Sequence, residues 1–240
     1  MRYAVIGDIH GNFHALESVL KDAEQQGYDK LLCVGDLVGY GAQPAECIEG
    51  VREKETIVVA GNHDFGVVEK TTIECFNADA QDAVIWTRDQ LTEEQKNYLK
   101  ELPLVHEMED LTLVHGTLCY PEYFDYIQTL YDAYLSFQAL HTPICFLGHS
   151  HVPIVFFNDN PISYFMEPEV DLEDAPKVIV NVGSVGQPRD QDPRACYAIF
   201  DVEKKRVWLR RVEYDVEAAK QKILDAGLPP TNAHRLLLGR

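Results

Sequence analysis

Short apolar runs alternate with amphipathic stretches along the first quarter of the chain. The runs at 3–7, 31–34 and 57–60 have the length and composition of buried strands. Helical stretches separate them, one beginning after Asn12, which can act as an N-cap, and one at Pro44, which suits a first helical turn. Their apolar positions recur with helical spacing at Leu16, Val19, Leu20 and Ala23, and at Cys47, Ile48 and Val51. Strands that alternate with helices predict a parallel sheet.

The same alternation continues as far as residue 150. The stretch 77–103 is predicted to be helical, with Thr92 and Gln95 spaced as a capping box and Pro103 at its end. A strand, a helix and a second strand are then expected at 111–114, 129–141 and 144–147.

Beyond residue 150 the pattern changes to apolar segments separated only by turns. Such segments follow one another, with no helical stretch between them, at 152–157, 162–166, 178–182, 195–200 and 206–213. This order predicts an antiparallel sheet, followed by a last helix from Asp215 to Gly227. The acidic run from Glu167 to Asp174 is typical of a solvated loop.

These elements fit one α/β domain over residues 1–240. Its parallel βα half would cover 1–151, its antiparallel strands 152–213 and its C-terminal helix 215–227. The composition agrees, since 46% hydrophobic and 25% charged residues are ordinary for a globular protein. Six cysteines are scattered without CxxC spacing, which favours buried thiols in a reducing cytoplasm. With neither a signal-peptide core nor a membrane-spanning stretch visible, we expect a cytoplasmic protein without membrane contact.

The formal net charge of −18 argues against sequence-independent binding of nucleic acid through a basic face. Anionic small substrates are not excluded by it. A bound divalent cation dominates the field inside its own cleft, whatever the charge of the distant surface. The local chemistry therefore has to be sought in the polar residues themselves.

Polar side chains that can ligate a metal stand directly after five of the predicted strands. They are Asp8 and His10, then Asp36, then Asn62 and His63, then His115, and last His149 and His151. Because loops at the carboxyl ends of parallel strands converge on one crevice, these side chains are expected to meet. Any one of the five pieces can arise by chance or as a core histidine, but all five in order favour a metal centre.

The donor types narrow the choice of metal. Neutral imidazoles with carboxylate and amide oxygens suit Mn²⁺, Fe or Zn²⁺ better than Ca²⁺, and the lack of cysteine argues against structural zinc. On an extended backbone, Asp8-x-His10 and His149-x-His151 would each point both side chains to one side, so each pair could share one cation or bridge two. Glycines precede four of the pieces, as in sharp turns that bring backbone close to a ligand; they are Gly7, Gly35, Gly61 and Gly148.

The five pieces resemble the motifs of the calcineurin-like metallophosphoesterase superfamily. They read Gly7-Asp8-Ile9-His10-Gly11-Asn12, Gly35-Asp36, Gly61-Asn62-His63-Asp64, His115-Gly116 and Gly148-His149-Ser150-His151. The later stretch Asn181-Val182-Gly183-Ser184-Val185-Gly186-Gln187-Pro188-Arg189 is similar to a loop of the small bacterial and archaeal phosphodiesterase-like members, with Val182 where such relatives often have proline. The resemblance implies a sandwich of two sheets flanked by helices.

The same resemblance implies a two-metal site. One metal would be held by Asp8, His10, Asp36 and His151, and the other by Asp36, Asn62, His115 and His149, with Asp36 as the bridge. Two divalent ions, expected to be Mn²⁺ with Fe, Zn²⁺ or Ni²⁺ as alternatives, would lower the pKa of a shared water, and the resulting hydroxide would attack a phosphoester in line with its leaving group. His63 would face the leaving oxygen as a general acid, and Asp64 could hold its imidazole in the protonated form or occupy an exposed turn.

Substrate-binding residues are less sharply defined by the sequence. Ser/Thr protein phosphatases of the superfamily carry Gly-Asp-x-Val-Asp-Arg-Gly, whereas this chain reads Gly35-Asp36-Leu37-Val38-Gly39-Tyr40-Gly41. The missing phosphate-binding arginine argues against that branch and against the related dinucleoside-tetraphosphate hydrolases. Arg189, Arg194 or no residue could take its place, and either arginine could instead pair with Asp190 or Asp192.

The Tyr-rich segment 120–134 follows His115 and has two interpretations. It could form a base-stacking wall or lid above the metals, or it could belong to the core or to a subunit interface.

Together these features predict a dinuclear-metal hydrolase that cleaves a phosphodiester or a small nucleotide phosphoester. Its partner would be a small phosphoester substrate, and the oligomeric state stays open. A non-catalytic metal-binding scaffold and a nucleotide sensor are the alternatives. Retention of every ligand type and of His63 favours the enzyme over the scaffold, while a sensor would bind nucleotide without releasing product.

Overall fold

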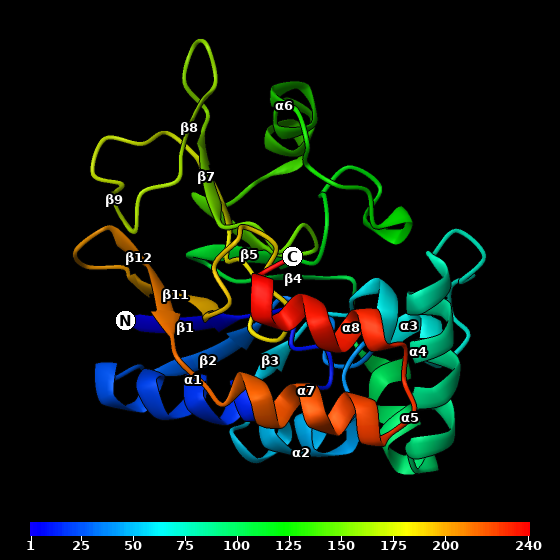
Figure 1. Ribbon diagram of the computed structural model, residues 1–240. Helices are drawn as coiled ribbons and strands as arrows, with labels where there is room; N and C mark the ends of the chain where they lie inside the picture. The colour runs from blue at the N-terminus through cyan, green and yellow to red at the C-terminus, as the bar shows by residue number, and fades with distance from the viewer.

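The computed structural model describes residues 1–240 and contains two six-stranded sheets packed face to face (Figure 1). The first sheet has the strand order β3 (Ile57–Val58), β2 (Lys30–Cys33), β1 (Arg2–Ile6), β11 (Ala195–Asp201), β12 (Arg206–Val212) and β9 (Glu169–Asp171). The second has the order β4 (Val105–Glu107), β5 (Leu111–Val114), β6 (Ile144–Leu147), β10 (Val178–Asn181), β7 (Ile154–Phe157) and β8 (Ser163–Phe165).

Helices cover the outer faces of both sheets. The first sheet is covered by α1 (Phe13–Gln26), α2 (Pro44–Glu53) and α7 (Val216–Asp225), and the second by α6 (Leu130–Ala139) (Figure 1). The shorter elements are α3 (Asn62–Val67), α4 (Ala78–Gln90), α5 (Glu93–Glu101), α8 (Pro230–His234) and the 3-10 turns η1 (Pro121–Tyr123) and η2 (Arg235–Leu238). This arrangement confirms the predicted sandwich of two sheets flanked by helices.

The central strand β1 shows why the core forms where it does. Ala4 and Ile6 belong to the apolar cluster under α1 and α2, while Tyr3 and Val5 pack against the second sheet. All four side chains are buried. A strand covered on both faces has a continuous apolar sequence, which is why the hydrophobic pattern located it correctly.

Helix boundaries largely follow the sequence signals. Asn12 caps α1, since its side-chain oxygen accepts a hydrogen bond from the backbone N–H of Ala15. The stretch 77–103, predicted to be helical, forms two helices, α4 and α5. Leu91 is extended between them, and the predicted capping box of Thr92 and Gln95 begins the second helix.

The antiparallel sheet predicted beyond residue 150 does not form as a separate unit. β11, β12 and β9 extend the first sheet, with β11 antiparallel to β1. β10 joins the second sheet parallel to β6 and antiparallel to β7, and β8 completes that edge. Both sheets are mixed because the late strands pair with the open edges that β1 and β6 offer.

Several segments predicted as loops contain regular structure. The acidic run includes β9, where Glu169 and Asp171 both accept hydrogen bonds from the Arg206 guanidinium of β12. The residues after α7 form α8 and η2, and the N–H of Gln191 donates to the carbonyl of Gly239. The C-terminal segment is thereby tied to the loop that follows β10. None of the helices combines the length and the hydropathy needed to traverse a bilayer.

The six cysteines form no disulfide. Four are buried as predicted, namely Cys33, Cys47, Cys145 and Cys196. The prediction was wrong for Cys75, which is exposed, and for Cys119, which is partly exposed, because both lie on surface loops outside the apolar strands.

Candidate metal centre

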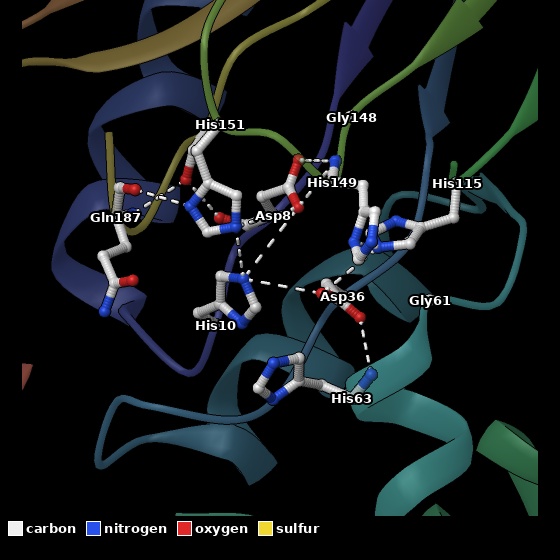
Figure 2. A network of polar contacts seen from close by, with 12 residues as sticks. Asp8, His10, Asp36, Gly61, His63, His115, Gly148, His149, His151 and Gln187 are labelled. Carbon is white, nitrogen blue, oxygen red and sulfur yellow. Dashed lines mark hydrogen bonds and ion pairs between the residues drawn. The ribbon is translucent and has the colours of Figure 1, made fainter. Parts of the chain in front are cut away.

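The predicted ligands converge at one edge of the sandwich, as Figure 2 shows. They follow β1, β2, β3, β5 and β6, and therefore arrive from strands of both sheets. All are nearly inaccessible to solvent: Asp8, His10, Asp36, Asn62, His115, His149 and His151. Three sets of side chains bring their ligand atoms within 4.8 Å of one another: Asp8, His10 and His151; His10, Asp36 and His63; and Asp36, His115 and His149.

Hydrogen bonds to backbone carbonyls fix the histidine tautomers on the side of His10 and His151. Nδ1 of His10 lies 3.0 Å from the carbonyl oxygen of Val38. Nδ1 of His151 lies 2.6 Å from that of Gln187 (Figure 2). A carbonyl only accepts, so both Nδ1 atoms carry the proton. The two Nε2 lone pairs then face each other at 3.1 Å. Only a cation placed between them satisfies both, and the donor set therefore fits a metal.

His115 repeats this arrangement on the other side. Its Nδ1 donates to the carbonyl of Val34 at 2.8 Å, which leaves the Nε2 lone pair facing the interior of the site. Around that nitrogen lie Oδ1 of Asn62 at 3.1 Å, Nδ1 of His149 at 3.0 Å and Oδ2 of Asp36 at 3.3 Å. The four potential ligand atoms, His115 Nε2 and its three neighbours, thus lie together, and no backbone N–H group donates a hydrogen bond to them.

Asp36 lies between the two groups of ligands. Its Oδ2 is 3.5 Å from Nε2 of His10 and 3.3 Å from Nε2 of His115. Its Oδ1 accepts a hydrogen bond from the backbone N–H of His63 at 2.9 Å, which fixes the carboxylate plane (Figure 2). This position suits a carboxylate shared by two cations.

The backbone of the ligand loops is not extended, contrary to the assumption behind the two-residue spacing. Asp8 and His10 have φ values of 50° and 51°, and His149 and His151 have 67° and 61°. Left-handed conformations at non-glycine residues store strain and gather at functional sites. The two pairs also differ: Asp8 and His10 join one set of ligands, whereas His149 and His151 are divided between two.

Two of the four glycines before the ligands are explained by close approach of a carboxylate. A Cβ on Gly61 would lie 2.0 Å from Oδ1 of Asp36, and one on Gly148 would lie 2.1 Å from Oδ2 of Asp8. Both contacts are impossible for a larger residue. These glycines therefore set the positions of the two carboxylates that are candidate metal ligands.

The pKa values of the buried groups indicate that the site favours bound positive charge. Burial lowers the pKa of His115, but the carboxylates of Asp36 and Asp8 outweigh it and raise that pKa to about 9. Burial raises the pKa of Asp8 to about 7, and the neighbouring charge of Asp36 adds to the effect. Without metal, the site therefore retains protons that a bound cation would displace.

The pH dependence of metal-free stability tests this charge balance. A folded-state pKa of Asp8 near 7, above its unfolded value, adds stability at low pH that is lost as the pH rises through about 7. Asp8→Asn removes this loss. In the presence of a chelator, we expect the melting temperature of Asp8→Asn relative to the wild type to rise by several degrees between pH 5 and pH 8. A difference that is constant or falls with pH would contradict this assignment.

His63 and Asp64 do not interact as the sequence suggested. The Asp64 carboxylate accepts hydrogen bonds from the backbone N–H groups of Asp36, Leu37, Val38 and Gly61, and it is fully buried. It is therefore neither a partner of the imidazole nor part of an exposed turn. Its charge is used to hold the loop that presents Asp36.

The His63 imidazole lies beside His10 with a ring-centroid distance of 4.8 Å (Figure 2). Its Nδ1 is buried without a hydrogen-bond partner and faces Gly39, where the phosphatase motif has aspartate. Burial lowers the pKa of His63 to about 4 against the opposing charge of Asp36. With Nδ1 buried, Nε2 is the nitrogen left for the adjoining cleft, whose lining includes His63.

The two candidate arginines are placed differently. Arg194 forms a two-pronged ion pair with Asp192 and lies at the surface. Arg189 is half-buried, has no carboxylate partner, and packs its guanidinium 5.6 Å above the ring of Tyr40. Tyr40 occupies the arginine position of the phosphatase motif. Arg235 of η2, which the sequence reasoning missed, is also near, since burial and the charge of Arg189 lower its pKa.

The end of β10 and the loop after it hold the loops that carry Asp8 and His149 by hydrogen bonds. The hydroxyl of Ser184 donates to the carbonyl of Asp8 at 2.8 Å, and the side-chain amide of Asn181 donates to the carbonyl of Gly148 at 2.6 Å. Val182, the departure from the usual proline, is fully buried among apolar side chains of the core between the sheets. The presence of valine instead of proline at position 182 therefore leaves these supporting hydrogen bonds in place.

The Tyr-rich segment does not pack as a core element. Tyr120, Tyr123, Tyr126, Tyr131 and Tyr134 are all exposed, and Phe124 is the one buried aromatic residue of the segment. Tyr126 stacks on His149 with a ring-centroid distance of 3.8 Å. The core interpretation was therefore wrong for the tyrosines, while a wall beside the metal ligands agrees with the position of Tyr126.

Sequence comparison places these residues in a known context. The profile described as the calcineurin-like phosphoesterase superfamily domain matches residues 1–205. An uncharacterized protein of Methanocaldococcus jannaschii is 38% identical over 241 residues, which cover 99% of this chain and 98% of that protein. A symmetrical bis(5'-nucleosyl)-tetraphosphatase of Glaesserella parasuis is 34% identical over 122 residues, 47% of this chain and 43% of that protein.

Structural comparison agrees along the whole chain. A metallophosphoesterase from Sphaerobacter thermophilus superposes with a TM-score of 0.90 at 40% identity, covering 100% of this chain and 99% of that one. A hypothetical protein from Pyrococcus horikoshii OT3 shares the fold, with a TM-score of 0.81 at 21% identity over 100% of this chain and 98% of that one.

Proposed function

The chain belongs to the calcineurin-like phosphoesterase superfamily, and on that basis we propose that it hydrolyses phosphodiesters or small nucleotide phosphoesters with two bound divalent metal ions. The observation that carries this proposal is the convergence of imidazole lone pairs and carboxylates on either side of Asp36. Such a donor set, held by backbone carbonyls and oriented before any ligand arrives, costs little reorganisation when cations bind.

Each metal position has its own residues in this proposal. Asp8, His10 and His151 would hold one ion, Asn62, His115 and His149 the other, and Asp36 both. Bound divalent ions supply an activated water and positive charge that stabilises the phosphoryl oxygens. Mn²⁺ is the expected occupant, because mixed nitrogen and oxygen ligands suit it and harder ions such as Ca²⁺ avoid imidazole.

Two residues outside the ligand set act on the substrate. Arg189 has a guanidinium free of carboxylates beside the centre, which suits bidentate binding of a phosphoryl oxygen pair. Arg189 would thereby take the phosphate-binding role of the arginine in the phosphatase motif, whose sequence position Tyr40 occupies. His63 lines the adjoining cleft and is placed to act as the general acid toward the leaving oxygen.

Turnover of two chromogenic esters by metal-free and Mn²⁺-loaded protein tests the proposal. We expect bis-p-nitrophenyl phosphate to be hydrolysed only with metal, and p-nitrophenyl phosphate more slowly, because a diester carries one negative charge less into an acidic protein. Preferential hydrolysis of the monoester would indicate that the substrate is instead a small phosphate monoester. No turnover of either ester with metal demonstrably bound would contradict the proposal and favour a sensor or scaffold.

A further inference from the structure

A cleft of about 470 Å³ opens directly beside the metal centre. Asn62, His149 and His63 form part of its lining, so it adjoins the metal position on the His115 side. Its walls come from two loops far apart in sequence, residues 71–77 before α4 and residues 123–126 after η1. The volume lies within the roughly 300–1,000 Å³ typical of small-ligand sites.

The walls of this cleft are aromatic. Phe76 stands on one side with its ring centroid 4.9 Å from that of His63. Tyr126 stands on the other, with one face stacked on His149 and 41% of its surface exposed. Phe76 is partly buried and also packs against the core, and both residues contribute to the lining of the space between the two loops. Such a pair of walls accepts a flat ring between or against them.

The polar lining excludes a second phosphate from this cleft. It contains neither lysine nor arginine, and its single charged side chain is Asp125. The other hydrogen-bonding groups on the loops are uncharged and include the side chains of Thr71, Thr72 and Asn77 and the hydroxyls of Tyr123 and Tyr126. The occupant is therefore uncharged, flat on one part and rich in hydroxyl or amide groups on another. A nucleoside has this chemistry, because a carboxylate and hydroxyls suit its sugar and aromatic faces suit its base.

We propose that this cleft binds the leaving group of the substrate, and that the leaving group is a nucleoside. The inference rests on the proposed phosphoesterase function of the same site. In the hydrolysis, water oxygen forms a new bond to phosphorus, the bond from phosphorus to the nucleoside oxygen breaks, and that oxygen takes up a proton. His63 lies in the lining between the metal ligands and Phe76, at the place where the leaving oxygen must pass.

Protection of Cys75 from alkylation tests occupancy of the cleft without measuring turnover. Cys75 is an exposed thiol in the cleft lining, and Cys119→Ser removes the only other accessible one. In this Mn²⁺-loaded variant, adenosine 5'-monophosphate should slow alkylation by iodoacetamide severalfold, while ribose 5-phosphate at equal concentration should not. Equal protection by the two compounds would show that only the phosphate is recognised and would overturn the proposal.

Removal of one aromatic wall tests which residue recognises the base. Phe76→Leu keeps an apolar side chain but loses the stacking face, and it should weaken binding of adenosine 5'-monophosphate by about 5- to 100-fold in calorimetric titration. Binding of ribose 5-phosphate should not change. Phe165→Leu on the edge strand β8 is the matched control, since Phe165 is 49% exposed and lies outside the cleft; it should bind both compounds as the wild type does.

The outcomes separate this inference from the proposed function. Metal-dependent hydrolysis of bis-p-nitrophenyl phosphate without preferential binding of adenosine 5'-monophosphate would overturn the nucleoside site and leave the phosphoesterase intact. Binding that depends on Phe76 in a protein without turnover would support the cleft and overturn the enzyme. Unchanged nucleotide binding by Phe76→Leu would contradict the assignment of the aromatic wall.

Discussion

Replacing Asp36 by asparagine is expected to lower metal-dependent phosphodiester hydrolysis by at least about a thousandfold. Asp36 is the carboxylate shared between the ligand groups of His10 and His115, so the substitution removes charge from both metal positions. An outer partner of a single metal ligand already contributes about 10- to 100-fold to metal affinity, and a shared inner ligand should contribute more. The measurement is the initial rate with bis-p-nitrophenyl phosphate at saturating Mn²⁺.

Asparagine preserves the shape of the side chain at this position. Its Oδ1 can still accept from the backbone N–H of His63, and no new atom meets Gly61. The fold should therefore persist, which circular dichroism can check. Asp89→Asn, at an exposed carboxyl on α4, is the matched control and should retain full activity. An active Asp36→Asn enzyme would contradict the shared role of this carboxylate.

Replacing His63 by alanine has the second largest expected effect, about 10²- to 10⁴-fold on kcat for an ester with a poor leaving group. The loss should be much smaller for p-nitrophenolate, which leaves without needing a proton. The physical reason is that the His63 imidazole lines the cleft beside the candidate metal ligands, where the leaving oxygen of the substrate would lie. Rates for a series of aryl esters of rising leaving-group pKa measure this dependence.

The metal content distinguishes this role from a structural one. His63 touches Asp36 through its backbone N–H, which alanine retains. The His63→Ala protein should therefore bind as much Mn²⁺ as the wild type. If it instead lost metal, or lost the same factor for every leaving group, His63 would be a positioning residue and not the proton donor.

The candidate metal ligands were predictable because each is marked by its immediate sequence neighbours. Each polar piece ends an apolar run, and convergence of strand ends brings distant pieces together whatever the details of the loops. Asp8, His10, Asp36 and His115 all lie where that rule places them. The left-handed backbone at Asp8, His10 and Asp36 was not predictable, since aspartate and histidine carry no sequence mark that forces a positive φ.

The sequence did not identify residues whose place near the site depends on contacts between distant parts of the chain. The partners of the Asp64 carboxylate are backbone N–H groups, which every residue possesses, so the sequence could not distinguish them from His63. Phe76, in the loop before α4, packs beside His63, and Arg235 of η2 lies near Arg189, but no motif surrounds either residue. Pairing of late strands with early sheet edges was missed for the same reason.

Hydrophobic periodicity located strands with more than one apolar residue, including the edge strand β8 with its exposed Tyr164 and Phe165, and missed β9, which has only one. β1 and β6 are continuous apolar runs, whereas β9 lies at a sheet edge inside an acidic segment and is held by ion pairs to Arg206. An edge strand has one neighbour and one exposed face, so its sequence need not carry an apolar signal.

Stoichiometric reconstitution tests the central claim most directly. Metal-free protein is titrated with Mn²⁺ while bound metal per chain and turnover of bis-p-nitrophenyl phosphate are measured on the same samples. The arrangement of ligands on both sides of Asp36 predicts that turnover remains low with one ion bound per chain and reaches its maximum with two. Full turnover with a single bound ion, or turnover unaffected by removal of all metal, would contradict a two-metal phosphoesterase.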